Sequence, residues 1–169
     1  ATTRNKCISW QVLAQTGLNA ATLLTYLQQY TVTADIVVVI IGVNNVTAVT
    51  KNKQWLANLS TLTNYLQQAL RAQQIIYCGL PQFATFPLLP SPLRFYLHQV
   101  AKQLDHSLQL FCQRSPLTHY AAIPRFADNI TQLFAEDGFH PSAWAIQRWI
   151  NHVLPQVATI SARCTTQCS

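Results

Sequence analysis

Residues 35–43, DIVVVIIGV, form an almost entirely apolar run. A strand with one face in water alternates polar and apolar residues, and this run does not. Continuous apolar strands are typical of parallel sheets whose two faces are both covered by helices. The run therefore predicts an α/β protein with a buried parallel sheet.

The rest of the chain alternates between strand-like and helical patterns. Strands are predicted at Cys7–Leu13, Ile36–Ile41, 73–81 (QQIIYCGLP) and 119–124 (HYAAIP), and helices at Ala20–Gln29, 55–70, 93–111 and from Pro141 to about Leu154. No repeat or linker interrupts this order. It predicts a single domain over residues 1–160, with a three-layer α/β/α fold around a flavodoxin-like parallel sheet, and a C-terminal tail at 161–169.

Composition and charge argue against several classes of protein. The 11 basic and 5 acidic residues give a net charge of +6, but the basic residues are scattered and form no stripe that would bind nucleic acid. The longest apolar run, residues 36–43, is too short to cross a bilayer, so we expect a soluble protein with no transmembrane segment. The sequence does not decide whether the protein is cytoplasmic or is exported to the periplasm or the medium.

The five cysteines form no C-x-x-C pair and no zinc-type spacing with the histidines, so we expect neither a metal nor a cofactor. Cys7, Cys78 and Cys112 are predicted to be small buried hydrophobic residues. Cys164 and Cys168 can close a disulfide in an oxidising compartment, but the odd total does not establish one.

The loops after the strands are where a parallel sheet carries its ligand site. The last of them contains Asp137 and His140, in EDGFHPSAW. A carboxylate bonded to one ring nitrogen fixes the histidine tautomer and leaves the other nitrogen to accept a proton from a nucleophile. In the alternative interpretation, Asp137 only accepts from free N–H groups at a helix start and His140 is merely exposed.

Two further loops carry candidates for an oxyanion hole. Asn44 follows the buried strand, and its side-chain amide can donate a hydrogen bond to a developing oxyanion. Gly17 follows the preceding predicted strand, and its backbone N–H can be a second donor. Both residues are also common in ordinary turns, which is the alternative. Together with Asp137 and His140 they describe an acyl-transfer site without a nucleophile.

These residues resemble the SGNH (GDSL-type) family of esterases and lipases. QTGLNAATLL (15–24) looks like the family's glycine block, IGVNNVT (41–47) like its asparagine block, and DGFHPS (137–142) like its Asp-x-x-His block. The resemblance implies an SGNH-type fold in which Gly17 and Asn44 are the oxyanion donors. It also implies that Asp137 is the orienting acid and His140 the general base.

The chain departs from the family pattern at two points. Asn45 stands where the family has an aspartate, which affects the hydrogen bonds that brace this turn. No Gly-Asp-Ser is present, and none of the chain's serines sits in a nucleophile-type turn. The family's first strand, which carries that serine, would lie between the strands at 7–13 and 36–41. Since its loss would leave two buried edges unpaired, and since the chain starts at Ala1 without any methionine, we expect an N-terminal segment that is not in this chain.

The resemblance implies a serine ester hydrolase, carboxylesterase-like or lipase-like, that forms an acyl-serine from a small-molecule or lipid ester with a small or medium acyl group. Phe83, Phe86 and Leu89, in the apolar loop 83–97, are candidates for the acyl pocket or a lid, or they simply pack the loop. Lipase, thioesterase, arylesterase and sugar deacetylase activities are not separated. The alternative is a non-catalytic binding or scaffold module on the same fold.

Overall fold

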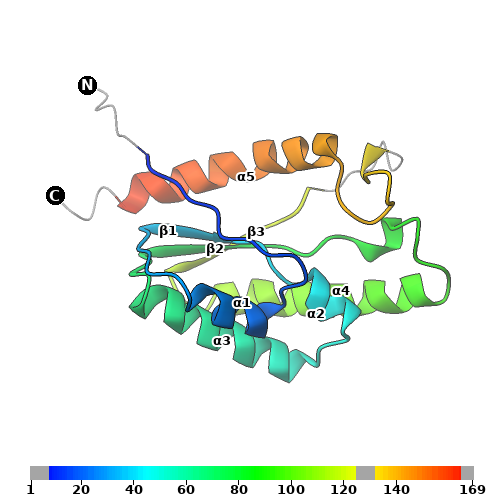
Figure 1. The fold of residues 1–169 in the computed structure, drawn as a ribbon, viewed down its shortest axis with the longest axis horizontal. Helices are drawn as coiled ribbons and strands as arrows, with labels where there is room; N and C mark the ends of the chain where they lie inside the picture. The colour runs from blue at the N-terminus through cyan, green and yellow to red at the C-terminus, as the bar shows by residue number, and fades with distance from the viewer. Residues whose placement is uncertain (1–7, 125–131, 165–169) are drawn as a thin grey trace.

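The protein is described here by a computed structural model that covers residues 8–124 and 132–164 (Figure 1). Within these residues, the strands β1 (Ile36–Val39), β2 (Gln74–Cys78) and β3 (Thr118–Ala121) form one parallel sheet in the order β1-β2-β3. Parallel neighbours need long crossover connections, and helices supply them here.

The helices lie on both faces of this sheet (Figure 1). Their bounds are α1 (Ala20–Leu27), α2 (Val43–Thr47), α3 (Asn52–Gln68), the 3-10 turn η1 (Phe83–Thr85), α4 (Leu93–Cys112) and α5 (Ala143–Cys164). Figure 1 shows α1 to α4 below the strands and α5 above them. The predicted three-layer α/β/α fold is therefore confirmed. None of the helices in the described ranges is both long and apolar enough to cross a membrane.

The core lies on both sides of β2, which is the central strand. Ile75 and Tyr77 belong to the larger apolar cluster, while Ile76 and Cys78 belong to the cluster beneath α5. Successive strand residues point to opposite faces, so β2 is buried on both faces. The larger cluster contains the predicted apolar side of α3, Trp55, Leu59, Leu62 and Leu66, and the predicted side of α4, Leu97, Leu104 and Leu108.

The predicted strand at Cys7–Leu13 is wrong for the residues that the structure describes. Residues 8–13 pair with no strand, and Ile8, Trp10 and Val12 are 84%, 81% and 70% exposed. A strand needs a neighbour to satisfy its backbone groups, and residues 8–13 have none. Cys7 itself lies outside the described residues.

The last helix is longer than its sequence predicts. α5 runs to Cys164, beyond both Leu154 and the domain boundary at residue 160, although it contains Pro155. A proline inside a helix costs about 3 kcal/mol. Val153 before the proline and Ile160 after it are both buried in the cluster beneath α5, so tertiary packing offsets this cost.

Two of the cysteines are free and buried, as predicted. Burial raises the pKa of the Cys78 thiol to about 11 and that of the Cys112 thiol to about 12. Both therefore behave as small apolar groups at neutral pH. Cys168 lies outside the described residues, so the possible Cys164–Cys168 disulfide stays a prediction.

Candidate active site

The loops that follow the strands gather at one end of the sheet. Figure 1 shows α2, η1 and the segment from residue 132 to 142 at this carboxyl end. Gly17, Asn44 and His140 all border one large hollow here, which we call the central hollow. The hollow has a volume of about 2730 Å³ and is also bordered by residues 8–18, by residues 32–44 and by parts of α4 and α5. Gly17, Asn44 and His140 thus border the same hollow, whose lining does not include Asp137.

The segment that carries Asp137 and His140 is a tight loop closed by backbone hydrogen bonds. Ser142 N donates to Leu133 O at 2.9 Å and Ala135 N to His140 O at 2.8 Å. Gly138 N donates to Ala135 O at 2.9 Å, and Gly138 has a φ of +63°, which favours glycine. The chain therefore reverses direction between Asp137 and His140, which returns the imidazole to the carboxylate.

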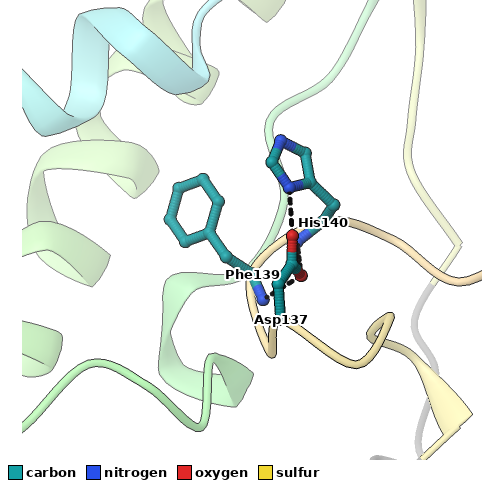
Figure 2. A network of polar contacts seen from close by, with 3 residues as sticks. All are labelled: Asp137, Phe139 and His140. Carbon is teal, nitrogen blue, oxygen red and sulfur yellow. Dashed lines mark hydrogen bonds and ion pairs between the residues drawn. The ribbon is translucent and has the colours of Figure 1, made fainter.

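Asp137 and His140 form a hydrogen-bonded pair (Figure 2). His140 Nδ1 and Asp137 Oδ2 are 2.5 Å apart, and Asp137 Oδ1 accepts from the backbone N–H groups of Phe139 at 3.0 Å and His140 at 2.9 Å. An ionised carboxylate only accepts, so in the neutral ring Nδ1 carries the proton and Nε2 presents its lone pair. The His140 and Asp137 side chains are 66% and 51% exposed, and no described residue hydrogen-bonds to Nε2. The pair has the geometry of an oriented general base.

Three hydrogen bonds hold the pKa of the Asp137 carboxyl at about 2, below its ordinary value of 3.8. The largest contribution is the bond to the His140 side chain, followed by the backbone N–H groups of Phe139 and His140. A depressed pKa means that the paired carboxylate favours the folded protein above about pH 3.8. This contribution is lost as the pH falls towards 2.

We expect replacement of His140 with alanine to raise the pKa of Asp137. The value should stay below 3.8, because the two backbone N–H donors remain. An NMR pH titration of the Asp137 carboxyl carbon measures this pKa. His152→Ala on α5 is the control for the loss of a histidine elsewhere. Equal midpoints in the wild type and His140→Ala would show that the ring does not stabilise this carboxylate.

Asn44 lies in the first turn of α2, five residues after the end of β1. Its Nδ2 donates to Leu18 O at 2.9 Å, which ties it to the loop that contains Gly17. An amide nitrogen carries two protons, so one N–H remains for another acceptor. Gly17 is exposed and has a φ of +83°, with open space around the position of a Cβ. The positive φ explains why this position is a glycine. The role of its N–H as an oxyanion donor stays a prediction.

Asn45 is buried and braces the same turn from the other side. Its Oδ1 accepts from Ala20 N at 3.0 Å, at the start of α1, and its Nδ2 donates to Thr50 Oγ1 at 3.2 Å. Asn45, which stands where the family has an aspartate, therefore keeps the turn braced, because its amide both accepts and donates hydrogen bonds.

Gly42 begins α2 with a φ of +123°. A Cβ there would lie 2.4 Å from Leu80 Cδ2 and 3.2 Å from the Trp55 ring. The close approach lets β1 turn into α2 against the loop that follows β2.

Asp105 on α4 is a structurally important residue that the sequence analysis missed. Its Oδ1 accepts from Leu80 N at 2.8 Å and its Oδ2 from the Tyr120 hydroxyl at 2.8 Å. These bonds fix the start of the loop after β2 next to β3. Its helical spacing was the available signal, since Asp105 comes four residues after Ala101 and three before Leu108, which α4 buries. Charged side chains enter cores only when they are paired.

The predicted pocket residues lie in the loop after β2. Phe83 and Phe86 are buried and stacked, with ring centroids 4.6 Å apart, while Leu89 is half-buried against the core. Phe86 borders the central hollow, and Phe83 and Leu89 do not. Contact of these three residues with an acyl group stays a prediction.

The serine nearest to His140 in sequence has a structural task. Ser142 Oγ accepts from Ala145 N at 3.1 Å and donates to Gln132 O, so it caps the start of α5 as expected. No serine in the described ranges hydrogen-bonds to His140. These ranges also contain no group of three His, Cys, Asp or Glu side chains placed to hold a metal ion.

A parallel α/β/α sheet with an Asp-His pair beyond its carboxyl end is typical of one class of hydrolases. The sequence profile of the GDSL-like lipase/acylhydrolase family matches residues 4–147. The chain belongs to this family, which is a family of hydrolases. A search of curated proteins found no match.

Solved structures with this fold include two carbohydrate esterases and a lipase. A carbohydrate esterase family 3 protein from Talaromyces cellulolyticus is 15% identical, with a TM-score of 0.64 over 85% of this chain and 68% of that one. A family 3 carbohydrate esterase from Clostridium thermocellum is 13% identical, with a TM-score of 0.54 over 85% and 69%. The extracellular lipase of Streptomyces rimosus is 17% identical, with a TM-score of 0.50 over 85% and 76%. At these identities the likeness concerns the fold.

Proposed function

We propose that this protein is a serine ester hydrolase that acts through an acyl-serine intermediate, with the nucleophilic serine on a segment outside residues 1–169. The observation that carries the proposal is the Asp137–His140 pair, whose Nε2 is unpaired among the described residues at the carboxyl end of the sheet. Membership in a lipase/acylhydrolase family supports ester hydrolysis as the reaction.

In this mechanism His140 Nε2 removes the proton from the serine hydroxyl as its oxygen attacks the ester carbonyl. Asp137 holds the ring in the Nδ1–H tautomer and stabilises the imidazolium that forms. Asn44 Nδ2 and Gly17 N donate hydrogen bonds to the oxyanion, and His140 then protonates the leaving alcohol. Water releases the acid from the acyl-serine in the same way. Substrates are small-molecule or lipid esters of carboxylic acids.

The unpaired edge of β1 in the described sheet supports the presence of a further strand-forming segment. β1 hydrogen-bonds to β2 on one side, and no described residue pairs with its other edge. Val38 and Ile40 are 42% and 62% exposed on this part of the chain. The central hollow beside β1, about 2730 Å³, far exceeds the roughly 300–1,000 Å³ of an ordinary ligand pocket. A strand placed there would pair the edge of β1, cover its apolar side chains and bring a serine to the site.

Labelling with a fluorophosphonate probe, which reacts with activated serines, tests this proposal. Residues 1–169 alone should not be labelled, because the base and oxyanion donors have no nucleophile to act on. The natural protein with its upstream sequence should be labelled at a serine in that upstream segment. The same protein carrying His140→Ala is the matched control and should lose the label.

The other outcomes have different meanings. Labelling of residues 1–169 at one of their own serines would refute the missing segment. Failure of the extended protein to label would favour the binding or scaffold module.

A further inference from the structure

Two aromatic side chains connect the Asp137–His140 loop to the rest of the protein. Both catalytic side chains are more than half exposed, and the hydrogen bonds described above lie within the loop itself. Leu133 is buried, and Phe134 before the turn and Phe139 after it are half-buried and pack against the core. The orientation of the loop therefore depends in part on what the Phe134 and Phe139 rings contact.

Both rings contact the same residue, Phe86. The Phe86 ring meets Phe134 edge-on at 4.8 Å between centroids and Phe139 edge-on at 5.4 Å. Phe86 is buried and stacks on Phe83 at 4.6 Å with an angle of 8° between the rings. Edge-on and stacked rings are favourable, directional contacts.

Phe86 has a defined place relative to the sheet. It directly follows η1, and its N–H donates to Phe83 O at 3.2 Å. Asp105 fixes the start of the same loop at Leu80, two residues after the end of β2. Phe86 therefore links the loop that follows β2 to the loop that carries His140.

We infer that Phe86 is a positioning residue that sets where His140 lies relative to the sheet and to Asn44. The Phe86 ring contacts Phe83, Phe134 and Phe139, and the Phe139 ring in turn meets the His140 ring edge-on at 5.6 Å. Phe86 therefore acts through Phe134 and Phe139. The catalytic meaning of this role rests on the proposed function. The packing role itself does not.

The test replaces Phe86 with leucine, which keeps the position apolar but removes the ring. Phe111→Leu is the matched control, because Phe111 makes an edge-on contact with Tyr77 at 6.2 Å, away from this loop. Backbone ¹⁵N relaxation of Gly138, Phe139 and His140 in the natural full-length protein reports loop order. Order parameters should fall from about 0.85 towards 0.6 in Phe86→Leu and stay unchanged in Phe111→Leu.

If Phe86→Leu fails to fold, Phe134→Leu removes a ring of the loop itself and leaves the Phe83–Phe86 stack in place. It should lower the same order parameters. Unchanged order at residues 138–140 in the folded variants, or an equal change in Phe111→Leu, would overturn the inference.

Turnover separates this inference from the proposed function. In an active esterase, Phe86→Leu should lower kcat by up to about 100-fold, because small displacements of a catalytic group have effects of this size. An effect confined to KM would instead indicate contact of Phe86 with the acyl group. Loss of loop order in a protein without esterase activity would retain the positioning role and remove the proposed function. Normal loop order in an active Phe86→Leu enzyme would remove the positioning role and retain the proposed function.

Discussion

Replacement of His140 with alanine in the complete protein is expected to lower kcat for ester hydrolysis by several orders of magnitude, with about 10⁶ as the upper figure for a triad base. Loss of the imidazole removes the acceptor for the serine proton and leaves only oxyanion stabilisation and substrate binding. The side chain is 66% exposed, so the fold should stay intact. Steady-state turnover of p-nitrophenyl acetate measures kcat, and circular dichroism checks the fold.

The matched control is His152→Ala, which removes an exposed histidine from α5. It should leave turnover close to that of the wild type. A His140→Ala protein that keeps most of its kcat would remove His140 from the mechanism.

Replacement of Asn44 with alanine should lower kcat by roughly 10²–10³ and leave KM almost unchanged. The reason is that an oxyanion donor acts mainly in the transition state. Asn44 also donates to Leu18 O, so the free energy of unfolding has to be measured for the same variant. Asn58→Ala on α3 is the control for loss of an asparagine elsewhere, whose side chain accepts from Gln54 one turn earlier in the same helix. An effect confined to KM would make Asn44 a binding or turn residue.

Local patterns explain what could be predicted from the sequence. Trp55, Leu59 and Leu62 recur at helical spacing, and the structure buries all three on one side of α3. Asp137 and His140 are three residues apart across a glycine turn, so their contact needs little more than that turn. A motif whose geometry is contained within four residues can be recognised without the rest of the fold.

The features that could not be predicted depend on distant parts of the chain. Ile8–Leu13 has the composition of a strand, but a strand forms only where a partner supplies hydrogen bonds. The extension of α5 past Pro155 depends on packing against β2. The contacts of Phe86 join two loops about fifty residues apart, and no spacing rule connects them.

Gly42 limits how the sequence around this site can evolve. Any other residue there would adopt a φ of +123° and place its Cβ 2.4 Å from Leu80. A shift of Leu80 would disturb the loop that leads to Phe86, whereas a shift of the backbone would move Asn44. One mutation would thus perturb two parts of the site at once, and its repair would require changes in two separate segments. Gly42 is therefore closed to gradual substitution.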